Sequence, residues 1–156
     1  MFISVDFDGT CVTHEYPRIG KDIGAEIVLR KLVSGGHNII CTTMRSSKDK
    51  IDTVGQAMEW FEKRGIPLYG FNDNPSQREW SSSRKIFAHI YIDDQFLGVP
   101  LAEDSRISNR PFVNWVECAE LLYLNGFITI REYREIIKEF KEKYEQLYEI
   151  LWGSKG

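Results

Sequence analysis

The sequence has few cysteines and no long hydrophobic run, and both absences narrow what the protein can be. Its cysteines, Cys11, Cys41 and Cys118, are widely spaced and form no Cys-x-x-Cys pair, which argues against a disulfide framework and a structural zinc site. No stretch of about 18 consecutive apolar residues occurs, and the first residues lack the basic and apolar regions of a signal peptide. We therefore expect a cytoplasmic protein that does not enter a membrane.

An excess of charge of one sign is also missing. Lysine and arginine number 20 and aspartate and glutamate 23, so the formal net charge is -3. This balance argues against electrostatic binding of nucleic acid or anionic lipid through an extended basic surface, although it allows a small basic pocket. We do not expect a nucleic-acid partner, and any phosphate group must be bound locally.

The sequence does contain short apolar runs that alternate with longer segments of helical period. This alternation is typical of an α/β protein with a parallel sheet flanked by helices. A chain of 156 residues usually forms one such unit. The expected strands are 2–5, 38–42, 68–71 and 86–92, and the expected helices of this part are 22–34 and one that Ser46 or Ser47 caps and that ends at Gly65.

The chain after residue 113 has a different character, because its strand signals vanish and two helical stretches separated by Gly126 take over. Thr129 and Glu132 predict a capping box, after which apolar residues recur three or four apart up to Leu151. We divide the chain into a core, 1–113, and a helical extension, 114–156. The apolar stripe of the extension can pack on the core or form a homodimer, and its charged face is expected to be solvated.

Polar side chains follow the predicted strands at the points where they end. Asp6 and Asp8 come after the first strand, Thr43 after the second, and Asp93 and Asp94 after the last. Because the carboxyl ends of neighbouring parallel strands form the ligand crevice of such sheets, we expect these side chains to face one site. Four carboxylates brought together need a counter-charge, and hard oxygen ligands favour Mg²⁺. The residues therefore predict a magnesium site.

The loop after the first strand suits phosphoryl chemistry. Gly9 lets the backbone turn, and amides exposed after such a turn can hold a phosphoryl group. Asp6 is a candidate nucleophile for an aspartyl-phosphate, and Asp8 can transfer protons. Thr43 is the candidate hydroxyl donor and Lys85 the candidate cation at the phosphate oxygens.

Together these residues resemble the four motifs of the haloacid dehalogenase-like superfamily. The matching segments are DFDGT at 6–10, TMR at 43–45, Lys85 ahead of a strand, and IDD at 92–94. The resemblance spans residues 1–98 and is greatest to small capless phosphatase-like members. It implies a Rossmann-like sheet, and no gap between the motifs is large enough for a cap domain.

The resemblance also implies roles for the carboxylates. Asp6 would attack phosphorus, while Asp8 would protonate the leaving group and later activate the hydrolytic water. The Asp6 carboxylate, the Asp8 carbonyl and an acid of the fourth motif would hold Mg²⁺. We favour Asp94 as the direct metal ligand. Asp93 would then interact with a metal ligand or reach the metal through a water.

The remaining site residues come from the same loops. By the same resemblance Thr43 would bind a phosphoryl oxygen and Lys85 would offset its charge. Arg45 either binds substrate or begins the following helix, and His14 lies in a loop that can cover the site. The residues expected to touch the substrate are Gly9, Thr10, His14, Met44 and Arg45.

These features predict a Mg²⁺-dependent phosphomonoester hydrolase with an exposed site. Its phosphorylated substrate can be a small molecule or a macromolecule. Alternatives are a phosphoacceptor or metal-binding signalling module, a phosphotransferase, and an oligomerising scaffold with incidental hydrolysis.

Overall fold

A four-stranded parallel sheet forms the centre of the computed structural model, which describes residues 1–47 and 50–154. The strand order is β3-β2-β1-β4, and β1 lies between β2 and β4, with Val5 opposite both Cys41 and Ile92. The expected α/β class is thus confirmed. The strands are β1 (Phe2–Val5), β2 (Asn38–Cys41), β3 (Leu68–Phe71) and β4 (Ile90–Ile92).

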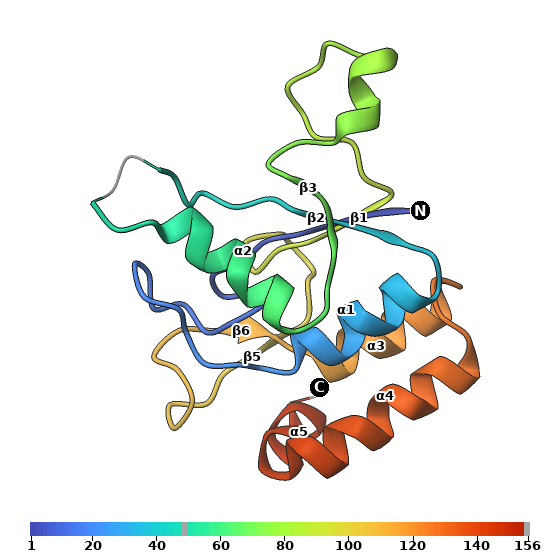
Figure 1. Ribbon diagram of the computed structural model, residues 1–156. Coiled ribbons are helices and arrows are strands. Elements are labelled where there is room, and N and C mark those ends of the chain that lie inside the picture. The colour runs from blue at the N-terminus through green and yellow to red at the C-terminus, as the bar shows by residue number, and fades with distance from the viewer. Residues whose placement is uncertain (48–49, 155–156) are drawn as a thin grey trace.

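The helices lie mainly on one side of this sheet (Figure 1). Helix α1 (Ala25–Ser34) joins β1 to β2, and α2 (Thr53–Lys63) joins β2 to β3. The connection from β3 to β4 contains only the short 3₁₀ helix η1 (Pro75–Glu79) and extends on the other side. Alternate strand residues such as Ile3 and Val5 are fully buried in the core under the helices.

The second helix begins later than its sequence pattern indicates. The prediction that Ser46 or Ser47 caps it was wrong, because the Asp52 side chain accepts a hydrogen bond from the Gly55 amide at 2.8 Å and the helix begins at Thr53. The Thr53 hydroxyl instead donates to the Ser46 carbonyl at 3.1 Å. Side-chain bonds therefore hold the segment before α2 in a loop, of which residues 48 and 49 lie outside the described part.

The fourth strand is shorter than the expected run 86–92, since it begins only at Ile90. The Tyr91 hydroxyl donates to the Ile86 carbonyl at 2.7 Å and accepts from the Ala88 amide at 3.0 Å. The Ile86 carbonyl and the Ala88 amide thus bond to a side chain and do not extend the sheet, whereas the His89 amide still donates to the Phe2 carbonyl of β1 at 2.8 Å.

An antiparallel pair of two-residue strands, β5 (Leu101–Ala102) and β6 (Phe112–Val113), follows the sheet and was not predicted. Elements this short carry no periodic signal. The Val113 amide donates to the Gly9 carbonyl at 2.9 Å, so this pair is anchored to the loop that follows β1.

Three helices complete the chain, and the predicted capping box of Thr129 and Glu132 is confirmed. The last predicted helix is broken at Tyr144, which ends one helix and precedes the next. The Tyr144 hydroxyl donates to Glu26 at 2.6 Å. The helices are α3 (Trp115–Leu124), α4 (Ile130–Lys143) and α5 (Glu145–Gly153).

The helical extension packs on α1 of the core. The Phe140 ring fills the space beside Gly24, whose φ of +87° places it in the left-handed region just before α1. The charged face of α4 is not solvated throughout, because Glu135 pairs with Lys31 at 2.7 Å and Glu139 pairs with α1 as well.

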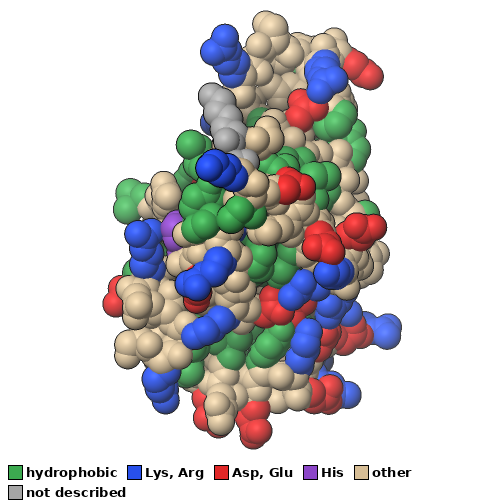
Figure 2. Space-filling view, turned by 60° about the vertical axis from the view of Figure 1, so that its left-hand side comes forward, with side chains coloured by type: hydrophobic (Ala, Val, Ile, Leu, Met, Phe, Trp, Pro, Cys, Tyr) green, Lys and Arg blue, Asp and Glu red, His purple; other side chains and the backbone are tan. Residues whose placement is uncertain are grey.

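Lysine and arginine side chains are mixed with aspartate and glutamate on the surface, as the small net charge of -3 requires (Figure 2). In the described part of the chain, the helices are all too short or too polar to cross a lipid bilayer.

Candidate functional site

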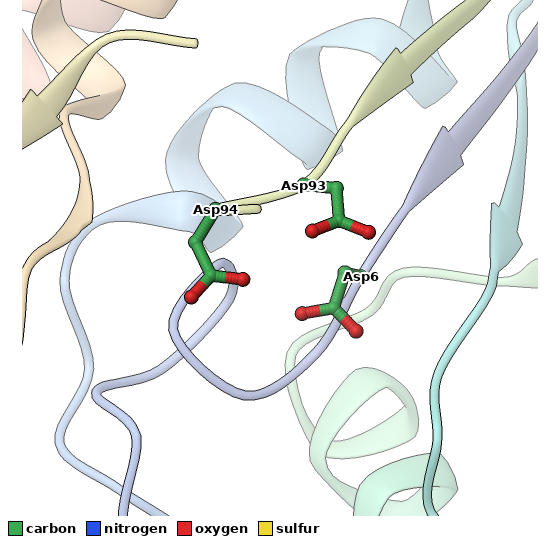
Figure 3. Close-up of side chains that lie close together, drawn as sticks. All are labelled: Asp6, Asp93 and Asp94. Carbon is green, nitrogen blue, oxygen red and sulfur yellow. The ribbon is translucent and has the colours of Figure 1, made fainter. Parts of the chain in front are cut away.

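Three carboxylates meet where β1 and β4 end (Figure 3). One oxygen each of Asp6, Asp93 and Asp94 lies within 4.8 Å of the other two. The meeting follows from the sheet register, because Val5 and Ile92 are partners and the Asp6 amide donates to the Ile92 carbonyl at 3.0 Å. The residues that come next on the two strands are therefore neighbours, as we predicted from the strand ends.

The protein environment disfavours negative charge in this cluster. Burial, and after it the charges of Asp93 and Asp94, raise the pKa of Asp6 to about 7, although hydrogen bonds from the Phe7 amide and the Thr10 hydroxyl act the other way. Burial and then Asp93 also raise the pKa of Asp94. Burial and mutual repulsion thus outweigh the contacts that favour the charged carboxylates.

The three carboxylates fit a magnesium ion. Mg²⁺ takes oxygen ligands at about 2.1 Å, which places neighbouring ligand oxygens about 3 Å apart and opposite ones about 4 Å apart. Oxygens within 4.8 Å of one another are close to this spacing, and carboxylates are the hard donors that this ion prefers. Asp6, Asp93 and Asp94 could therefore hold Mg²⁺, and both acids that follow β4 reach the cluster.

The affinity for Mg²⁺ is expected to depend on pH through Asp6. A carboxyl group must be deprotonated to bind a cation, and the pKa of Asp6 is about 7. The affinity should therefore fall about tenfold per pH unit below about pH 7 and level off above it. Calorimetric titration with Mg²⁺ at about pH 8 and about pH 6 measures this. Equal dissociation constants at the two pH values would contradict it.

Gly9 brings the loop after β1 against the carboxylates. Its φ is +85°, and a Cβ atom there would lie 2.4 Å from Oδ2 of Asp94. The Gly9 amide also donates to the Val12 carbonyl at 2.8 Å, which closes the turn. Glycine is thus required both by the left-handed backbone and by the close approach of Asp94.

Substitution of Gly9 by alanine is expected to displace Asp94 and to strain the turn. We expect at least about tenfold weaker Mg²⁺ binding, because one ligand group must move. Gly36→Ala is a matched control, since Gly36 also has positive φ, +85°, but nothing lies within 4 Å of its Cβ position. Calorimetry on both variants tests this, and equal Mg²⁺ affinities would rule it out.

Thr10 connects two of the three aspartates. It is fully buried, and its hydroxyl donates to Asp6 Oδ2 at 3.2 Å and accepts from the Asp94 amide at 3.0 Å. Its carbonyl accepts from Trp115 Nε1 at 2.7 Å. We expected Thr10 to contact the substrate, whereas the structure buries it behind Asp6 and Asp94, where it positions both residues.

Asp8 lies outside the carboxylate cluster and is paired with Arg45. Two guanidinium nitrogens each donate to one of its oxygens at 2.7 Å, and the Arg45 side chain is completely buried. The remaining N–H groups of Arg45 donate to the carbonyls of Pro17, Arg18 and Thr53. All five donors of Arg45 are thus bound within the protein rather than open to a substrate.

Thr43 is fixed by Asn72, which follows the third predicted strand and which the sequence places either at the edge of the crevice or in a turn. The Thr43 amide donates to Asn72 Oδ1 at 2.7 Å, and Asn72 Nδ2 donates to the Thr43 carbonyl at 3.0 Å. Asn72 has a φ of +49°, a conformation that asparagine tolerates better than most residues. Its place directly after a strand is the signal that could have identified it.

The other predicted residues lie around this centre. The ammonium of Lys85 sits 5.5 Å from the centroid of the Tyr91 ring, and within residues 1–47 and 50–154 it forms no ion pair with a carboxylate. Tyr91 lies on β4, two residues before Asp93, which follows the end of the strand. Met44 is 94% exposed. His14 contacts Arg110, a residue that we had not considered, at 3.4 Å.

Fold and site together define an α/β protein with an acidic centre at the carboxyl edge of a four-stranded parallel sheet. A solved structure of a conserved protein from Bacteroides thetaiotaomicron is similar to it, with 30% sequence identity and a TM-score of 0.60. The similarity covers 85% of this chain and 95% of the other. The chain therefore belongs to the family of that conserved protein. No family model and no curated protein matches the sequence.

Proposed function

We propose that this protein is a Mg²⁺-dependent phosphomonoester hydrolase of the haloacid dehalogenase-like superfamily. The observation that carries the proposal is the cluster of Asp6, Asp93 and Asp94 at the ends of β1 and β4, beside the turn at Gly9. When bound there, Mg²⁺ supplies positive charge that offsets the carboxylates and the phosphate oxygens.

Asp6 is the proposed nucleophile. Its carboxylate oxygen attacks phosphorus and forms a P–O bond, while the bond from phosphorus to the leaving oxygen breaks and the electron pair goes to that oxygen. Asp8 donates a proton to the leaving oxygen. A water then attacks the aspartyl-phosphate and gives its proton to Asp8, which restores both carboxyl groups and releases phosphate.

Two further side chains fit roles in this reaction. The Thr43 hydroxyl accepts from the Arg45 amide at 3.2 Å, which leaves its own proton free to donate to a phosphoryl oxygen. Lys85 would have to turn away from the Tyr91 ring to approach the same group.

The connections between the strands support a core without a cap domain. The β1 to β2 and β2 to β3 connections each contain one helix, α1 and α2. Neither holds a folded insertion, so we place this chain among the capless members. The site would then be exposed and could accept either a small phosphate ester or a phosphorylated macromolecule.

Hydrolysis of a generic aryl phosphate, p-nitrophenyl phosphate, tests the proposal. We expect product release with Mg²⁺, loss of release when a chelator removes the metal, and recovery when Mg²⁺ is added back. The protein's thermal unfolding should be followed in parallel to show that the metal-free protein remains folded. Release that is independent of metal in a folded sample would contradict the proposal.

A second candidate, a phosphoacceptor module, is favoured by the contact between Asp8 and Arg45. Both oxygens of Asp8 accept bonds from the guanidinium, so Asp8 would have to leave Arg45 before it could exchange a proton with a leaving group or a water. The lifetime of phosphate on Asp6, measured after incubation with acetyl phosphate, separates the two candidates. If the phosphate on Asp6 is hydrolysed as fast as the enzyme turns over, the result supports the hydrolase. A phosphorylated protein that is stable for minutes supports the phosphoacceptor.

A further inference from the structure

Two loops meet at one side of the carboxylate cluster. The first, residues 14–21, follows β1, and the second, residues 103–111, joins β5 to β6. The Lys21 ammonium donates to the Ile107 carbonyl at 2.8 Å, and an Arg110 guanidinium nitrogen lies 3.4 Å from both ring nitrogens of His14. The two loops therefore form one wall.

This wall stands beside the proposed reaction centre. The β6 residue Val113, three positions after Arg110, donates to the carbonyl of Gly9, and Gly9 in turn abuts Asp94. His14 lies within electrostatic range of the same carboxylate, since burial and Asp93 raise the pKa of Asp94 and His14 acts against them. Arg110 and His14 are therefore close to the place that the phosphate ester would occupy.

One acidic side chain of each loop pairs with an arginine of its own loop. Glu15 pairs with Arg18 at 3.6 Å, and Asp104 pairs with Arg106 within its own loop. Over the described ranges 1–47 and 50–154, no carboxylate pairs with Arg110. Its guanidinium instead faces the His14 imidazole, so its charge can pair with an incoming anion.

The arginine is accessible from outside the protein. Both Arg110 and the contact with His14 are exposed to solvent. An incoming ligand can therefore reach the guanidinium without any rearrangement of the loops.

We propose that Arg110 and His14 bind a second anionic group of the substrate, so that the preferred substrates are phosphate monoesters that also carry a carboxylate or a second phosphate. The proposal rests on the hydrolase function proposed above. The forked donors of an arginine suit a carboxylate and a phosphate equally. A substrate with one phosphate and no other anion would leave Arg110 facing only His14.

Three substrates that share one leaving-group ring test this selectivity. These are phenyl phosphate, 3-carboxyphenyl phosphate and 1,3-phenylene bisphosphate, assayed with Mg²⁺ on the full chain. For the wild type we expect a higher kcat/KM with at least one of the two substrates that carry an added anion than with phenyl phosphate. In Arg110→Ala the ratio of kcat/KM for that substrate to kcat/KM for phenyl phosphate should fall about tenfold, with the change in KM rather than kcat.

Arg106→Ala is the matched control, because Arg106 is an exposed arginine of the same loop whose partner is Asp104. We expect it to keep the wild-type ratio within about twofold, and we expect Arg110→Lys to keep part of the preference. Comparison of kcat/KM for 3-carboxyphenyl phosphate with kcat/KM for 1,3-phenylene bisphosphate shows which added anion is preferred.

Three results would overturn the inference: an unchanged ratio in Arg110→Ala, a wild type without preference for either added anion, or an equal loss with all three substrates. The last result would assign Arg110 to the transferred phosphate. Absence of Mg²⁺-dependent turnover with all three substrates would instead refute the hydrolase function and, with it, this selectivity.

Discussion

Asp6→Asn is expected to abolish turnover, by at least about 10³-fold, and at the same time to stabilise the metal-free protein at about pH 8. The first effect follows because an amide cannot serve as the nucleophile. The second follows because the asparagine removes a charge that the buried site disfavours. Loss of activity together with a gain of stability is a combination that ordinary damage to the fold does not produce.

The sign and the pH window of the stability effect come from the pKa of Asp6, which the fold raises from 3.8 to about 7. Between these values the folded state binds more protons than the unfolded state, so stability falls as pH rises from about 4 to about 7. A shift of this size corresponds to at most about 4 kcal/mol, and we expect about 2 to 4 kcal/mol at pH 8. At about pH 4 the gain should be near zero.

Urea unfolding of both proteins in the presence of a chelator, at about pH 8 and about pH 4, measures this difference. Asp73→Asn is a suitable control, because Asp73 belongs to an exposed ion pair with Arg78 and should change stability by less than about 1 kcal/mol. If Asp6→Asn were less stable than the wild type at about pH 8 without metal, the carboxylate would not be destabilised as inferred.

Arg45→Met is expected to be the most destabilising single substitution at the site, at about 3 to 5 kcal/mol. It leaves Asp8 without its buried cation and removes donors from the carbonyls of Pro17, Arg18 and Thr53. Pro17 and Arg18 lie in the loop that follows β1, and Thr53 begins α2, so both this loop and the start of the helix should loosen. Thermal or urea unfolding measures the loss, and Arg78→Met, in the exposed pair with Asp73, is the control.

Two further variants separate charge from position at this contact. Arg45→Lys keeps the charge but not the two parallel bonds to Asp8, so it should keep most of the stability and still lower kcat, with a changed pH profile. In Arg45→Met combined with Asp8→Asn, the loss of stability should be smaller than the sum of the single losses, because no unpaired charge remains. Additive losses, or an unchanged pH profile in Arg45→Lys, would contradict a positioning role for Arg45.

The sequence was a reliable guide to the order of the elements and to the placement of the acids. Strands 2–5 and 68–71 were predicted with their observed bounds, since buried parallel strands read as short apolar runs. Asp6 and Asp93 follow such runs, and parallel pairing alone brings them together. The boundary errors lie where side chains bond to the backbone, as Asp52 does at α2 and Tyr91 does before β4.

The partners of individual site residues were not predictable in the same way. We expected four carboxylates to converge, and three do, while Asp8 bonds to Arg45, which lies 37 positions away in the chain. The direction of a side chain in a turn depends on the elements that pack against it. For Asp8 this is the Arg45 guanidinium, which is buried beneath loop 14–21. No periodic pattern records such a contact.

The amino-acid sequence by itself determined the α/β class, the parallel sheet and the edge at which the carboxylates gather, because periodicity and strand ends are local properties of the chain. Only the tertiary structure decided which carboxylates share the cluster, that Arg45 is committed to Asp8, that Asn72 holds Thr43, and that Arg110 meets His14. Each of these contacts joins residues from separate loops. Loop conformation is set by packing and by side-chain hydrogen bonds across the fold, and these exist only after the chain has folded.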